Sequence, residues 1–124
     1  MAFEEFHKSK YVSSKGNFIT ITKTGVMNVS TEAYQGFLKG VEHVLFLFDR
    51  EKNLIGIKPM KEKNLNSYNV RVMERGKAAA KAISISAVAF LKHYNIDYRE
   101  KRKLEPKWQD EKHELIVLDL NKPL

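Results

Sequence analysis

The sequence predicts a β-rich α+β domain made of two pseudo-repeated β-β-α-β-β units that share one core. Residues 28–34 and 84–90 follow the same pattern: a small polar residue, a β-branched residue and a serine, with an alanine three positions later and then an aromatic. Each copy is preceded by a glycine-containing turn and followed by two strand-like segments that a charged turn separates. The chain has 124 residues, of which 43% are hydrophobic, enough for one compact domain or two closely packed halves.

The first unit is expected to cover residues 17–60, after an N-terminal arm of residues 1–16. Residues 18–22 alternate apolar residues with threonine, which predicts a half-buried strand, and residues 26–29 predict its return. Gly25 ends the tight turn between them, where a positive φ is expected. Ser30 is a good N-cap for a short helix that stops at Gly40. Residues 44–48 are apolar on both faces and predict a buried central strand, followed by a strand at 54–57 that Pro59 ends.

The second unit is expected to cover residues 68–120, after a polar linker at residues 61–67. An alternating strand at 69–73 leads into a long basic turn, and a strand at 82–85 returns from it. Ser86 is expected to cap a second helix, which stops at Asn95 in a left-handed conformation. Two strands, at 104–108 and 114–120, form the last hairpin.

This element order resembles the AbrB-type swapped-hairpin family, and two units in one chain resemble its MraZ arrangement. The resemblance covers residues 17–120, and its best local match is Glu74-Arg75-Gly76-Lys77, with an acid before the glycine and a base after it. The resemblance implies a DNA-binding fold. In a second frame, residues 31–94 follow the order helix, four strands, helix, which is similar to the middle of Whirly proteins and implies single-strand binding.

The net charge of +7, from 22 basic and 15 acidic residues, favours a polyanionic partner. The lead hypothesis is therefore a cytoplasmic DNA-binding protein, a transcriptional regulator that acts as a homo-oligomer and prefers double-stranded DNA. Basic turns supply mobile cations and exposed amides for phosphate oxygens, and arginine can also read guanine. The expected nucleic-acid contacts are Lys23, Arg71, Arg75, Gly76, Lys77 and Lys81.

A second basic cluster follows the second helix and consists of Arg99, Lys101, Arg102, Lys103 and Lys107. Trp108 beside it is expected to pack against the core rather than to stack on a base. Alanine at Arg75 and Lys77 is expected to weaken duplex binding more than alanine at Lys101 and Lys103. The reason is that a protruding hairpin can enter a groove, while a cluster after the helix need not face the same way.

Other classes of function find little support in the residues. The chain has no cysteine, its four histidines are scattered, and no metal-ligand spacing or catalytic set is recognisable, so we expect no enzyme, no metal and no cofactor. The N-terminus has no signal-peptide pattern and the apolar stretches are too short to span a bilayer, so no membrane partner is expected. Two alternatives remain: single-stranded nucleic acid bound on a sheet face, or a protein-interaction module, which an exposed apolar patch would favour.

Overall fold

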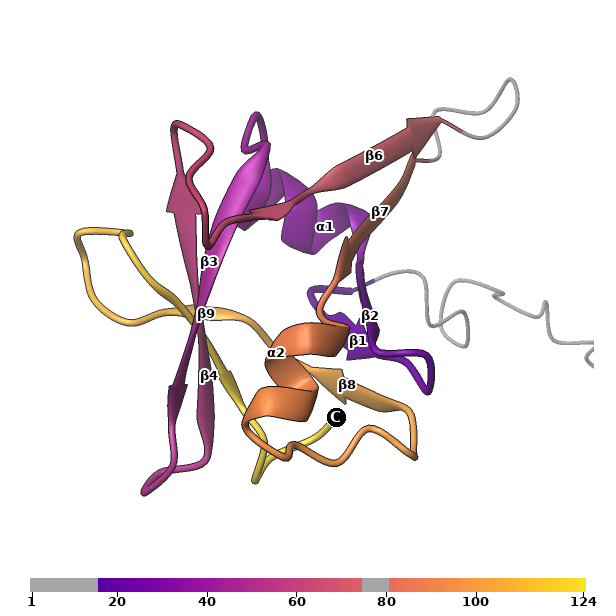
Figure 1. Cartoon of the computed structure of the whole chain (residues 1–124). Helices are drawn as coiled ribbons and strands as arrows, with labels where there is room; N and C mark the ends of the chain where they lie inside the picture. Colours follow the sequence, from indigo (N-terminus) through magenta and orange to yellow (C-terminus); the bar gives the residue numbers. More distant parts are fainter. Residues whose placement is uncertain (1–15, 75–80) are drawn as a thin grey trace, which may run out of the picture.

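The computed structural model describes residues 16–74 and 81–124 (Figure 1). Within these residues the chain forms two five-stranded antiparallel sheets and a few short helices, which confirms the β-rich α+β class. Sheet A contains, in spatial order, β6 (Arg71–Glu74), β7 (Lys81–Ser86), β2 (Val26–Val29), β1 (Ile19–Ile21) and β8 (Arg102–Leu104). Sheet B contains β5 (Tyr68–Asn69), β3 (His43–Asp49), β4 (Leu54–Met60), β10 (Ile116–Asp119) and β9 (Lys107–Trp108).

The chain crosses between the two sheets at both of their edges. Only Val70 separates β5 from β6, and only Glu105 and Pro106 separate β8 from β9. The strands predicted at 69–73 and 104–108 are therefore each split between two sheets. Proline has no N–H to donate to a ladder, which explains the break at Pro106. Because the edge strands bend from one sheet into the other, the two sheets form a flattened barrel whose interior is the core.

The core consists of the residues that alternate strands turn inward. Fully buried side chains include Ile21, Met27 and Ile85 from sheet A, and Ile57 and Leu118 from sheet B. The helices close the two ends of the barrel: α1 (Thr31–Ala33) and the π-helix η2 (Tyr34–Leu38) follow β2, while α2 (Val88–His93) follows β7. Since β2 and β7 are antiparallel neighbours, these helices lie at opposite ends of the molecule (Figure 1).

The two helices begin differently from the prediction. Ser30 is the N-cap of α1, and its Oγ accepts hydrogen bonds from the backbone N–H groups of Ala33 and Phe18, both at 3.1 Å. The prediction that Ser86 caps the second helix is wrong, because Ser86 is the last residue of β7 and the N-cap, Ala87, has no side-chain hydrogen bond. The backbone N–H of Ala87 instead donates to the carbonyl of Gly25 at 2.9 Å.

Two predictions about β3 and β4 are also wrong. Residues 44–48 are not buried on both faces, since Val44 is fully buried but Leu47 on the opposite face is 45% exposed. Pro59 does not end its strand but lies within β4, opposite Val44 of β3. The ladder between β4 and β10 ends at Ile57. Beyond that residue β4 has one strand neighbour, so the missing N–H of Pro59 is tolerated as on an edge strand.

Gly25 provides a test of the contact between the β1–β2 turn and α2. Its φ is +81°, and a Cβ at this position would lie 2.5 Å from Cγ2 of Val88. Gly40 has a similar φ of +77° but nothing within 4 Å of an added Cβ. We expect Gly40→Ala to lower the free energy of unfolding by about 1 kcal/mol, the strain of a left-handed residue. Gly25→Ala should lower it by roughly 2–4 kcal/mol, because a steric clash adds to that strain.

Urea unfolding of the two variants and the parent chain measures this difference. Gly40→Ala is the matched control, since it makes the same chemical change at the same kind of φ. If both variants lost the same free energy of unfolding, Val88 of α2 would not pack against the turn at Gly25.

Candidate nucleic-acid interface

A row of polar residues crosses the outer face of sheet A. Directly opposed residues in antiparallel strands share a face, so the registers place one residue of each strand in this row. Lys103 of β8 pairs with Thr20 of β1, Thr20 pairs with Asn28 of β2, Asn28 pairs with Ser84 of β7, and Ser84 pairs with Arg71 of β6. We call these five residues the polar row. It carries a cation at each end and no acid.

The ends of the polar row are available to a partner. Arg71 and Asn28 are exposed, Ser84 and Lys103 are half-buried, and Thr20 is 4% exposed. Neighbouring strands lie about 4.8 Å apart, so the backbones of Arg71 and Lys103 are separated by about 19 Å. The Nζ of Lys103 lies 4.8 Å from the ring centroid of Phe18, which positions this ammonium group by a cation–π contact.

Of the predicted contact residues that the structure describes, one lies in this row. Arg71 is its member on β6, while Lys81 begins β7 opposite Glu74. Lys23 is exposed in the β1–β2 turn, at the end of sheet A where α2 begins, and so lies at the other end of β7 from the backbone of Lys81. The predicted contacts Arg75, Gly76 and Lys77 lie outside the described residues.

Lys103 of the second basic cluster lies on the same face of sheet A as Arg71. Its position after the second helix does not predict this placement, which depends on the pairing of β8 with β1, of β1 with β2, and of β2 with β7. In the sequence, Asn28 and Ser84 stand out only as matching positions of the two units. The alternation within β2 and β7 could have placed them on a solvent face, but pairing between distant strands is needed to align them with Lys103.

Arg99, in the second basic cluster, forms an ion pair with Asp97. Its Nε and Nη2 donate to the two carboxylate oxygens of Asp97 at 3.1 and 3.0 Å, and its backbone N–H donates to Oδ1 at 2.9 Å. These hydrogen bonds lower the pKa of Asp97 from 3.8 to about 2. Because the pKa is lowered on folding, the pairing is fully present above about pH 4 and is lost as the pH falls towards 2. At neutral pH Arg99 is therefore a weaker candidate for phosphate than Arg71.

Trp108 packs as expected. Its ring lies 5.0 Å from that of Phe37 and stacks on His113 at 4.8 Å with an interplanar angle of 8°. It belongs to the half-buried residues that pack against the core, which confirms packing as its role in the described structure.

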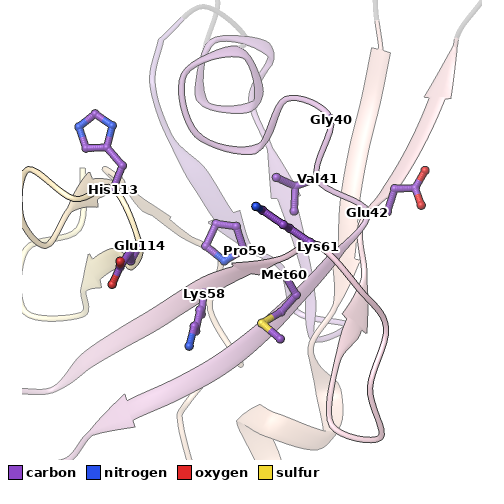
Figure 2. Close-up of a pocket in the computed structure, with 9 residues that line it drawn as sticks. All are labelled: Gly40, Val41, Glu42, Lys58, Pro59, Met60, Lys61, His113 and Glu114. Atoms are coloured by element: carbon purple, nitrogen blue, oxygen red, sulfur yellow. The ribbon is translucent and has the colours of Figure 1, made fainter.

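A hollow of about 590 Å³ lies between the segment after η2, the end of β4 and the β9–β10 loop (Figure 2). Lys58 and Lys61 line it with Glu42, His113 and Glu114, and the two lysines point in different directions (Figure 2). Among the described residues, none of these charged groups forms an ion pair. Nor do residues 16–74 and 81–124 contain a group of three or more His, Cys, Asp or Glu residues that could hold a metal ion.

None of the helices in the described part of the chain is long and apolar enough to span a membrane. Comparison with protein-family models, with curated proteins and with solved structures finds no match to this chain.

Proposed function

We propose that this protein binds nucleic acid, double-stranded DNA in preference to single strands, through the outer face of sheet A. The observation that carries the proposal is the polar row, which has Arg71 and Lys103 at its ends and Asn28 and Ser84 between them. Cations supply most of the affinity for a phosphate backbone, and short polar side chains can donate further hydrogen bonds to it. The turns at the end of sheet B, by contrast, mix acids with bases, as in Asp49-Arg50-Glu51-Lys52.

The spacing of the two cations supports a duplex. Their backbones lie about 19 Å apart across the sheet. The major groove of B-DNA is about 12 Å wide. An arginine and a lysine that lean inward from the two edges of the sheet can reach phosphates on both sides of such a groove.

The composition of the same face argues against single strands as the preferred ligand. Single-strand binders offer aromatic rings on which successive bases stack. The described strands of sheet A contain no aromatic residue, and the ring of Phe18, which precedes β1, is covered by Lys103. Phosphate contacts therefore fit this face better than base stacking.

The strand registers support an origin by duplication, in keeping with the resemblance to tandem swapped-hairpin proteins. Asn28 and Ser84, which occupy matching positions of the two units, pair with each other between β2 and β7. In sheet B, Gly56 pairs with Val117, and these are the third residues of the similar segments Leu54-Ile55-Gly56-Ile57 and Leu115-Ile116-Val117-Leu118. Pairing of equivalent residues is what a two-fold arrangement of two similar units produces.

The salt dependence of binding tests the proposal. With about five phosphate contacts, the logarithm of the association constant for mixed-sequence duplex DNA should fall with the logarithm of salt concentration at a slope of roughly −4 to −5. Fluorescence anisotropy with duplex and single-stranded oligonucleotides of equal length measures both slope and preference. No binding at low salt, or a flat salt response, would exclude DNA as the partner, and tighter binding to single strands would establish the alternative.

A further inference from the structure

The outer face of sheet B carries a group of aliphatic side chains that do not belong to the core. Leu47 of β3 lies opposite Gly56 of β4, which lies opposite Val117 of β10. Leu115 covers Gly56, because its Cδ1 would be 3.1 Å from an added Cβ at that position. We call this group, with two further members, the aliphatic face: Leu45, Leu47, Leu54, Leu115 and Val117.

This face differs from the outer face of sheet A, where the corresponding row is polar. Leu47 is 45% exposed and the other four members are half-buried, and none of the five is among the residues that form the core or pack against it. An antiparallel sheet with one solvated face normally places polar residues there. Contiguous exposed apolar surface on a folded protein marks a site of interaction with another protein.

The charges around the aliphatic face indicate the partner. At one end of the face, Leu54 is flanked by two carboxylates, since Asp49 and Asp119 are its neighbours on β3 and β10. Four residues further along β4, about 13 Å away, Lys58 is exposed next to Leu45. None of these three charged groups forms an ion pair within the described chain. Along β3, β4 and β10 the face is thus acidic at one end, aliphatic in the middle and basic at the other. Lys107 of β9, which lies beside Val117, is neutralised by its ion pair with Glu105 at 3.7 Å.

A two-fold axis that crosses the strands at Gly56 exchanges these two ends. It places Lys58 of one copy over Leu54 of the other, between the carboxylates of Asp49 and Asp119, and repeats the same contacts at the symmetry-related position. Sheets that pack face to face lie about 10 Å apart with nearly aligned strands, a distance that a lysine and an aspartate can bridge. We propose that the outer face of sheet B is the interface of an isologous dimer of this chain, with Lys58 paired to Asp49 and Asp119 of the second copy.

The proposal goes beyond DNA binding and does not depend on it. The sequence predicts a homo-oligomer, and the proposal specifies its interface and its two-fold symmetry. It also leaves the outer face of sheet A, which is a different surface of the barrel, free for its own partner.

Sedimentation velocity of the full chain, without DNA, tests the interface. The parent chain should sediment as a dimer in the micromolar range. Leu47→Glu should raise the dissociation constant roughly 100-fold, since it buries a charge in the centre of the interface. Leu65→Glu is the matched control, because Leu65 is fully exposed in the β4–β5 loop, outside the aliphatic face, and should leave the dimer intact. A parent chain that stays monomeric at all concentrations would overturn the proposal.

A charge exchange tests the orientation and does not rely on an apolar substitution. Lys58→Glu and Asp49→Lys should each weaken the dimer, and the double variant should recover part of the loss, because the exchanged charges face each other across the two-fold axis while Asp119 is unchanged. Within one chain the two groups lie too far apart to rescue each other directly. Single variants as dimeric as the parent, or a double variant weaker than both, would show that these residues do not meet in an isologous dimer.

Discussion

Replacing Arg71 and Lys103 together with alanine is expected to weaken binding to duplex DNA roughly 100-fold at constant salt, about tenfold for each charge-assisted contact to phosphate. The two residues lie on opposite edge strands of sheet A but share its outer face, so both can engage one duplex. The salt slope should also fall by about 2, since each lost phosphate contact removes nearly one released counterion. Anisotropy titrations at several salt concentrations measure both quantities.

Arg99→Ala is the matched control for this experiment. It also removes one surface arginine, but that guanidinium is held by both carboxylate oxygens of Asp97. Its affinity loss should be less than threefold, because the paired charge has little to contribute to phosphate. If Arg99→Ala weakened binding as much as the loss of Arg71 and Lys103, the effect would be one of net charge, and the polar row would not be the interface.

Phe90→Ala is expected to lower the free energy of unfolding by about 3–5 kcal/mol. Phe90 is 5% exposed and anchors α2 on sheet B. Its ring centroid lies 4.9 Å from that of Phe46 and 6.4 Å from that of Phe48, both on β3, and 5.2 Å from that of Tyr94. Removing the ring leaves a cavity between the helix and the sheet and breaks all three aromatic contacts. Such a loss is a large share of the roughly 5–15 kcal/mol that stabilises a typical domain.

Chemical denaturation followed by near-ultraviolet circular dichroism measures this loss. Phe90→Leu retains most of the buried apolar volume and should cost less than about 1.5 kcal/mol. A loss below 1 kcal/mol for the alanine variant would mean that α2 is not part of the cooperative core.

The sequence by itself determined the local features of this protein. The tight turn at Gly25, the cap at Ser30 and the left-handed stop at Asn95 each depend on a few neighbouring residues, and the structure has all three, with φ values of +81° at Gly25 and +55° at Asn95. Ser86 does not cap α2 as predicted, and the reason lies in the tertiary structure. β7 pairs with β2 as far as Ser86, so that residue is held in a strand and α2 begins after Ala87.

Only the tertiary structure decided which surfaces exist. Pairing of β1 with β8 and of β2 with β7 places Lys103 and Arg71 on one face, although the pairing residues are 54 or more positions apart in the sequence. The same closure of the barrel decides that one side of each strand in sheet B faces outward, so that Leu47 and Val117 form a surface rather than part of the core. A pattern of alternating residues shows that a strand has two faces. Which of them is buried, and which residues of other strands lie beside it, depends on strand pairings that residues distant in the sequence make.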